Sequence, residues 1–126
     1  MKIESLDHLV LTVKNLADTC DFYTRVLGME VARSSKNRTA LTFGRQKINL
    51  HEQGKGSTHV AHQPTPGSGD LCFITASPVA GIVQHLSDCG VAIEEGPVPR
   101  DGALGTMQSV YFRDPDLNLI EVSKYD

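Results

Sequence analysis

The stretch HLVLTV at residues 8–13 decides the fold, because DLCFIT at residues 70–75 repeats it 62 positions later. The same shift, without a gap, places LGMEV at residues 27–31 on CGVAI at residues 89–93. Each copy has the pattern of an apolar strand, a helix, a glycine that stops the helix, and a further strand. Self-similarity at one fixed spacing indicates that a single structural unit occurs twice in the chain.

Each copy contains one predicted helix. We expect the first to begin at Asn15, whose side chain can accept hydrogen bonds from free backbone amides, and to end at Gly28. Apolar residues at helical spacing form one stripe along it: Leu16, Cys20, Tyr23 and Leu27. We expect the second helix to begin with Ser77 as its cap and Pro78 as its first residue, and to end before Gly90.

Three strands are expected after each helix. They cover residues 29–34, 39–43 and 47–53 in the first copy, and residues 91–95, 107–112 and 118–123 in the second. A turn is expected at Asp114-Pro115-Asp116. The segments at residues 54–69 and 96–106 are rich in Gly and Pro, and loops of this length often take part in binding.

The predicted fold class is therefore α+β, with two tandem βαβββ units that form mixed sheets. The units cover residues 5–53 and 70–123, joined by the loop at 54–69, within one domain of residues 1–126.

The composition limits the classes of function. Of the 126 residues, 40% are hydrophobic and 21% are charged, which is typical of a globular protein. A net charge of -3, without a Lys/Arg-rich block, argues against nucleic acid as a partner. We find no apolar run long enough for a membrane span, and we expect a cytoplasmic protein. Cys20, Cys72 and Cys89 show no CxxC spacing, and we expect them to be small buried side chains.

Several motifs carry a family resemblance. The segments DHLVLTV at residues 7–13, LGME at 27–30 and YFRDPDLNLIEV at 111–122 resemble the glyoxalase/bleomycin-resistance/extradiol-dioxygenase domains of the vicinal oxygen chelate superfamily. Two further segments, NLHE at 49–52 and IEEGPVPR at 93–100, resemble the branch called glyoxalase domain-containing protein 5. The resemblance implies curved sheets around a cleft, a divalent metal ion (nickel, zinc or iron), a small-molecule substrate and a homodimer.

The resemblance also implies four metal-ligand positions, which fall on His8, Asn49, Asp70 and Glu121. His8 and Glu121 have the expected residue types. Asn49 offers a weaker amide oxygen, and Asp70 stands where His or Glu is usual. His51 is two residues beyond Asn49 on the same strand, so it faces the same side and can replace it. The predicted metal ligands are therefore His8, His51, Asp70 and Glu121.

Other roles are predicted for some of these residues and for their neighbours. Glu121 and His51 are the candidates for proton transfer in catalysis. Asn49, Arg100 and His62 are the candidates for substrate binding. Arg100 lies in the second long loop, at residues 96–106. His62 lies in the first long loop, at residues 54–69, which can fold over a cleft.

Four functions fit the resemblance. The first is a metal-dependent lyase or isomerase of the glyoxalase I type, similar to lactoylglutathione lyase, that acts on a small substrate with two adjacent oxygens. A metal-free binding or resistance protein and an extradiol-type dioxygenase are the alternatives; the dioxygenase requires two His and one carboxylate on iron. Thiol transfer of the fosfomycin type is disfavoured, because no cluster of cationic and hydroxyl residues for a phosphonate is evident in the sequence.

Overall fold

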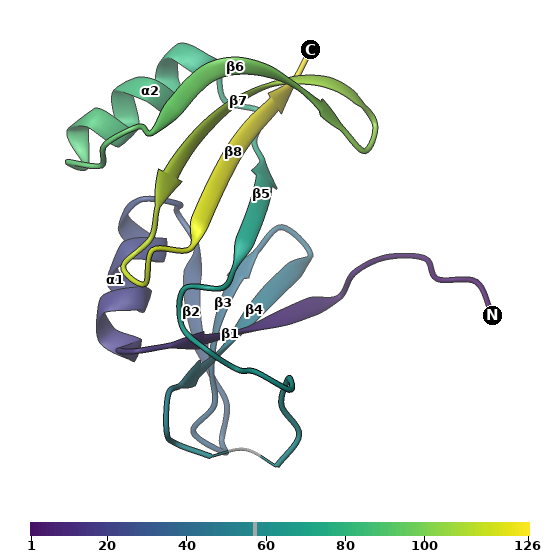
Figure 1. Ribbon diagram of the computed structural model, residues 1–126, viewed down its shortest axis with the longest axis vertical. Helices are drawn as coiled ribbons and strands as arrows, with labels where there is room; N and C mark the ends of the chain where they lie inside the picture. Colours follow the sequence, from purple (N-terminus) through teal and green to yellow (C-terminus); the bar gives the residue numbers. More distant parts are fainter. Residues whose placement is uncertain (57) are drawn as a thin grey trace. The chain divides into compact units, whose positions relative to one another are not determined.

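The chain forms two compact units, Met1–Pro66 and Gly67–Asp126, in a computed structural model that describes residues 1–56 and 58–126 (Figure 1). In unit 1 the elements are β1 (His8–Val13), α1 (Leu16–Arg25), β2 (Glu30–Arg33), β3 (Thr39–Phe43) and β4 (Gln46–Glu52). In unit 2 they are β5 (Asp70–Ile74), α2 (Val79–Asp88), β6 (Glu95–Gly102), β7 (Gly105–Arg113) and β8 (Leu119–Tyr125). Both units have the predicted βαβββ order.

Each unit contains one four-stranded mixed sheet. The strand order is β1-β4-β3-β2 in unit 1 and β5-β8-β7-β6 in unit 2. The first and last strands of each unit pair in parallel, and the other neighbours pair antiparallel. Because the two sheets share order and direction, the internal repeat in the sequence is confirmed as a repeat in structure.

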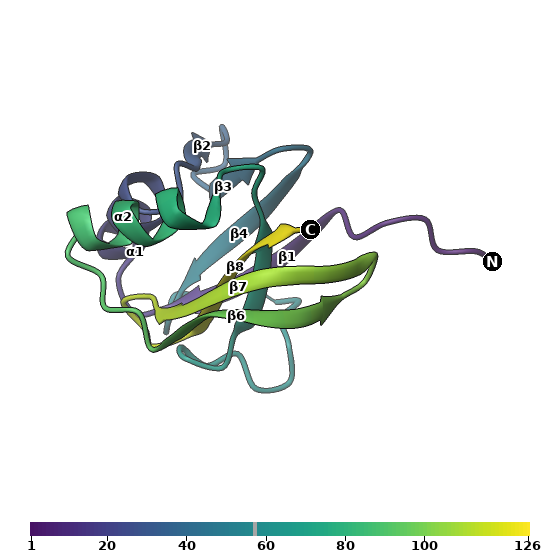
Figure 2. The same cartoon turned by 90° about the horizontal axis from the view of Figure 1, so that it is seen from above.

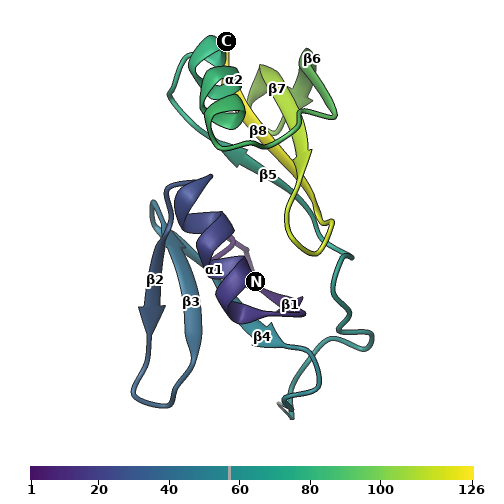
Figure 3. The same ribbon diagram turned by 90° about the vertical axis from the view of Figure 1, so that its left-hand side faces the viewer.

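In unit 1, α1 lies against the sheet (Figure 3), and the core of the unit lies between them. The sheet contributes alternate residues of its strands, including Leu11, Leu41 and Ile48, and the helix contributes Phe22 and Tyr23, all of them buried. This is the period-two and helical patterning that the sequence predicts.

Unit 2 has an equivalent core, in which α2 packs against β7 and β8 (Figure 3). Val110, Phe112 and Ile120 come from the sheet, and Ile82 and Leu86 come from the helix, all buried. The face of each sheet opposite its helix is called the open face below.

The start of the first helix is confirmed and that of the second is wrong. The Asn15 side chain accepts a hydrogen bond from the Asp18 N–H at 2.9 Å, as expected of a cap. In α2 the cap is Pro78, with no side-chain hydrogen bond, and the Ser77 N–H instead donates to Thr75 Oγ1 at 3.1 Å. Neither of these ten-residue helices, nor any other helix in the described parts of the chain, has the length and apolarity to cross a membrane.

The predicted strand at 91–95 and the predicted loop at 96–106 are both wrong. Most of that loop forms β6, which pairs with β7 at Glu95 and, after a shift of register, from Val98 to Gly102. The two strands run beside each other to their shared hairpin (Figure 2). The prolines at 97 and 99 suggest a loop because proline cannot donate to a sheet ladder. They are accommodated because β6 is the edge strand and pairs only with β7.

Candidate functional site

The predicted site residues that lie in strands all project from the open faces. Side chains that are opposite one another or two positions apart share a face of a sheet. In unit 1 this places His8, Asn49 and His51 on the open face, and in unit 2 it places Asp70, Glu121 and Arg100 there. Each unit therefore carries its own set of candidate groups.

In unit 1, the two strand histidines lie far apart on the open face. His8 stands opposite Lys47, Thr12 stands opposite His51, and Asn49 lies between the two positions along β4. Four positions along a strand correspond to about 13 Å, and side chains on one face stand roughly parallel. Ligand atoms of one metal ion lie within about 2–2.6 Å of it. Unit 1 by itself therefore does not bring His8 and His51 to one ion.

His8 has a carboxylate partner on the preceding residue. Its Nδ1 lies 2.7 Å from Oδ2 of Asp7, and the His8 side chain is 43% exposed. A carboxylate at Nδ1 favours the tautomer that carries its proton there, which leaves Nε2 free to accept a proton or bind a metal.

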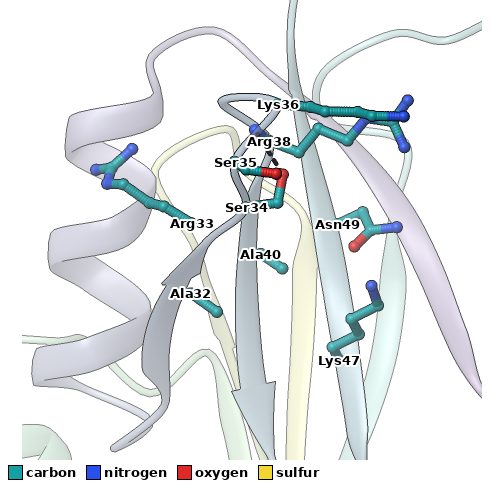
Figure 4. Close-up of a pocket in the computed structure, with 9 residues that line it drawn as sticks. All are labelled: Ala32, Arg33, Ser34, Ser35, Lys36, Arg38, Ala40, Lys47 and Asn49. Atoms are coloured by element: carbon teal, nitrogen blue, oxygen red, sulfur yellow. Dashed lines mark hydrogen bonds between the residues drawn. The ribbon is translucent and has the colours of Figure 1, made fainter.

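A pocket of about 470 Å³ opens beside the β2–β3 turn of unit 1 (Figure 4). Two small residues, Ala32 and Ala40, leave space at its base. Around them lie cationic, hydroxyl and amide side chains: Arg33, Ser34, Ser35, Lys36, Arg38, Lys47 and Asn49. The expectation that no cationic and hydroxyl cluster exists is therefore wrong. Five of these seven residues lie in the contiguous segment RSSKNR at residues 33–38, and only the approach of Lys47 and Asn49 on β4 depends on the hairpin.

A second pocket, of about 720 Å³, also lies within unit 1. It shares Arg38 and Asn49 with the first pocket, and His51 and His59 contribute imidazoles to its lining. His51 is half-buried there, which suits a residue that contacts a ligand. Asn49 and His51, both predicted site residues, thus line a pocket. The predicted site residue His62 is exposed on the loop that follows β4.

In unit 2, four polar side chains form a row across the open face. The register places Cys72 of β5 opposite Glu121 of β8, Glu121 opposite Tyr111 of β7, and Tyr111 opposite Glu95 of β6. Asp70 is two residues before Cys72 on the same face and is exposed. The row brings a thiol, a carboxylate and a phenol together on adjacent strands.

A chain of hydrogen bonds ends at the carboxylate of this row. The Ser123 hydroxyl donates to Glu121 Oε1 at 3.2 Å, and its oxygen lies 2.7 Å from Ser109 Oγ and 3.4 Å from Cys72 Sγ. Since Ser123 has one proton and gives it to Glu121, the Ser109 hydroxyl is the donor to Ser123, and the Cys72 sulfur contacts the same oxygen. The buried serines thereby fix the orientation of the half-buried Glu121.

Cys72 differs from its expected environment, because its side chain is exposed on the open face and not buried as predicted. Burial of the sulfur nonetheless raises the pKa of the Cys72 thiol, the hydrogen bond with Ser123 lowers it, and the Glu121 carboxylate raises it again. The thiol therefore stays protonated more readily than a free cysteine. Cys20 is buried as predicted, and Cys89 is partly exposed.

Arg100 lies in strand β6 and not in a loop, and it holds Tyr111 in place. Its Nε donates to the Tyr111 hydroxyl at 3.0 Å, and a second nitrogen donates to Glu95 Oε1 at 3.0 Å. The guanidinium carbon lies 5.4 Å from the centre of the Tyr111 ring. Burial raises the pKa of the Tyr111 phenol, the bond from Arg100 lowers it, and the nearby Glu121 raises it.

The predicted metal ligands do not form a metal site within either unit. Among residues 1–56 and 58–126, no three His, Cys, Asp or Glu side chains are grouped in a way that could hold a metal ion. Unit 1 offers His8 and His51 at separate positions, and unit 2 offers Asp70 and Glu121 on one face. Metal binding by these residues stays a prediction.

The comparison with known proteins identifies the family. Residues 5–122 match the Glyoxalase/Bleomycin resistance protein/Dioxygenase superfamily. The chain belongs to this superfamily. It is 51% identical over 125 residues to the virulence protein STM3117 of Salmonella typhimurium. The aligned region covers 99% of this chain and 87% of that protein. The crystal structure of STM3117 has a TM-score of 0.98 and covers 100% of both chains.

Two other relatives of this chain show how varied the superfamily is. The glyoxalase domain-containing protein RDO1 of Mycosarcoma maydis is 50% identical over 99% of this chain and 70% of that protein. The metallothiol transferase FosB of Staphylococcus epidermidis is 29% identical over 97% of this chain and 82% of that protein. Placement in the branch of glyoxalase domain-containing protein 5 stays a prediction, because these relatives do not test it.

Proposed function

We propose that the protein is an enzyme of the glyoxalase I-like type, which moves a proton on a small substrate with two adjacent oxygens, and that Glu121 is the proton-transferring carboxylate. The observation that carries this proposal is the setting of Glu121, half-buried on the open face of unit 2 and oriented by Ser123. A base for proton transfer needs such a fixed carboxylate within reach of bound substrate.

Tyr111 supplies the complementary group. Its phenol stands opposite Glu121 on the neighbouring strand and is held by Arg100. Because the pKa of this phenol is raised, it stays protonated at neutral pH and donates a hydrogen bond. When Glu121 removes a proton from carbon, negative charge develops on the adjacent oxygen, and a fixed donor beside that oxygen stabilises it.

The proposal includes a divalent metal ion, as members of this superfamily often use one. Such an ion (nickel, zinc or iron) would polarise the two substrate oxygens as a Lewis acid. On unit 2 the proposal assigns Asp70 and Glu121 to it, which share the open face. On unit 1 His8 stays a predicted ligand, and it has the carboxylate partner at Nδ1 that metal-binding histidines often have. His51 stays a second candidate for proton transfer, on unit 1.

Turnover of the methylglyoxal–glutathione adduct tests the reaction. Wild-type protein should form lactoylglutathione when supplied with nickel, zinc or iron, and Glu121→Gln should lower kcat by about 10²- to 10⁴-fold while its circular dichroism spectrum stays that of the folded protein. Glu94→Gln is the matched control, because Glu94 pairs with Arg113 in the same unit and should leave kcat within about twofold. Full activity in Glu121→Gln, or no turnover by the wild type with any metal, contradicts the proposal.

Metal analysis tests the assignment of ligands separately. Protein purified without a His tag should contain a divalent metal or gain thermal stability from one, since an ion that binds only the folded state stabilises it. His8→Ala and Glu121→Ala should each remove that gain, and His85→Ala, a histidine exposed on α2, should keep it. An equal gain in all four proteins would show that the metal binds elsewhere.

The second candidate function is binding of a small molecule without turnover. The two pockets of unit 1 favour it, because their volumes fall within the usual range for ligand sites. A bound ligand that is recovered unchanged, with an affinity that a chelator does not alter, would support it. The dioxygenase alternative requires two imidazoles on one iron, which unit 1 by itself does not supply.

A further inference from the structure

The pocket of about 470 Å³ in unit 1 has a charge opposite to that of the whole chain. The protein has a net charge of -3, with 12 Lys and Arg residues against 15 Asp and Glu. Four of those cations line this pocket, and no Asp or Glu lines it: Arg33, Lys36, Arg38 and Lys47. A concave surface with charge of one sign concentrates ligands of the opposite sign.

One of the four cations is already engaged. Arg33 donates to Thr39 Oγ1 at 3.0 Å, and Figure 4 shows its side chain turned away from the other lining groups, toward α1. Lys36, Arg38 and Lys47 make no ion pair with any residue in the described segments of the chain. Three cations therefore remain for a ligand.

Lys47 brings a cation to the pocket from the sheet. Lys47 is half-buried on β4, and Figure 4 shows its side chain extending along the strand toward Asn49. Because Lys47 makes no ion pair with any residue in the described segments, its ammonium can bind an anion there. Its neighbour across the β1–β4 pair is His8, which supplies no negative charge. An anion in the pocket provides the missing partner.

The remaining groups suit oxygen atoms of an anion. The turn between β2 and β3 holds Arg38 by its backbone, since the Arg38 N–H donates to Ser34 Oγ at 3.3 Å and its carbonyl accepts from the Ser34 N–H at 3.0 Å. The guanidinium is then free to bind two oxygens at once. Asn49 adds a neutral amide donor, and Ala32 and Ala40 leave the base open.

We propose that this pocket binds the doubly charged oxyanion of a small organic molecule, such as a phosphate monoester, through Arg38, Lys47 and Lys36. Three cations with no acidic residue among them match a ligand with two negative charges better than they match a ligand with a single carboxylate. The volume exceeds that of one phosphate ion and lies in the range for small-molecule sites. A nucleic acid would require an extended basic stripe instead of one concave pocket. The proposal makes no use of the reaction assigned to Glu121.

Calorimetric titration of the full chain with phenyl phosphate at constant ionic strength tests the site. We expect saturable binding, weaker binding of inorganic phosphate, and weaker binding still of benzoate, which carries one charge. Arg38→Gln and Lys47→Gln should each raise the Kd for phenyl phosphate by about tenfold or more, and Arg38→Lys should raise it less than Arg38→Gln. Amide NMR shifts should be confined to residues near 32–49.

Arg45→Gln is the matched control, because Arg45 is exposed in the β3–β4 turn, belongs to the same unit and does not line the pocket. It removes one positive charge and should leave the Kd within about twofold. The proposal is overturned if the wild type does not bind phenyl phosphate, if inorganic phosphate binds equally well, or if Arg45→Gln weakens binding as much as Lys47→Gln. Circular dichroism confirms that each variant is folded.

Discussion

The Cys72 thiol reports on Glu121, because the two residues stand opposite each other on paired strands and the carboxylate raises the pKa of the thiol. Glu121→Gln removes that negative charge, so the thiolate forms at lower pH. Since the thiolate is the nucleophile, iodoacetamide should alkylate Cys72 about two- to fivefold faster at pH 8 in the variant. Mass spectrometry of the labelled peptide measures the rate.

Asp70→Asn provides the control for this experiment. Asp70 also raises the pKa of Cys72, but it has the smallest of the influences on the thiol. Its removal should therefore accelerate alkylation less than the removal of the Glu121 charge. An unchanged rate in Glu121→Gln would show that the row on the open face of unit 2 is not formed as described.

Single residues differ in how far the sequence alone reveals them. His8 and Glu121 stand out because they lie in motifs with the residue types of a known site. Tyr111 and Lys47 do not, because each acquires its importance from a neighbour on another strand, Glu121 for Tyr111 and the β2–β3 turn for Lys47. Strand alternation gives the face of a residue but not the partner beside it, which depends on register.

At the level of elements, the helices and most strands follow from local pattern, and β6 does not. Residues 39–43 and the cap at Asn15 are predicted correctly, because alternation and capping act over a few neighbours. The segment that forms β6 contains Pro97, Pro99 and Gly96, which locally favour a loop. Its pairing with β7 at the sheet edge overrides that preference, and only the tertiary structure provides the pairing.

Gly96 is the residue through which β6 is most easily disrupted. Its φ is +111°, and a Cβ added there would meet the Ser109 carbonyl oxygen and lie 2.9 Å from Val110 Cα, both of them backbone atoms of β7. Gly96→Ala should therefore lower the free energy of unfolding by at least about 1–3 kcal/mol, as expected for a strained backbone conformation. Urea unfolding followed by circular dichroism measures the change.

Gly81→Ala is the opposite case within the same unit. Gly81 lies inside α2, and a Cβ added there has no atom within 4 Å. Alanine favours the helix over glycine, so this variant should be more stable by about 0.5–1 kcal/mol. Equal effects of the two substitutions would contradict the close approach of β6 to β7 at Gly96.

Over the whole molecule, the two repeats have the same framework and different chemistry. The row Val10–Asn49–Ala40–Ala32 in unit 1 occupies the strands that correspond to those of the row Cys72–Glu121–Tyr111–Glu95 in unit 2. Small side chains leave a cationic pocket in the first, whereas the second is filled by a hydrogen-bonded acid and phenol. The repeated backbone is predictable from the 62-residue shift, but this divergence depends on which side chains meet.

The open faces also lead us to expect a homodimer. Val10 in β1 is 47% exposed and Ile74 in β5 is 54% exposed, and both project from the open face of their own unit. Contact with a second copy of the chain would remove these apolar side chains from water. Light scattering after size exclusion should give twice the mass of one chain, and Val10→Asp with Ile74→Asp should give one chain mass with the helical content unchanged. Leu104→Asp, at the exposed β6–β7 hairpin, should remain dimeric, and a wild type that is monomeric at every concentration would refute the dimer.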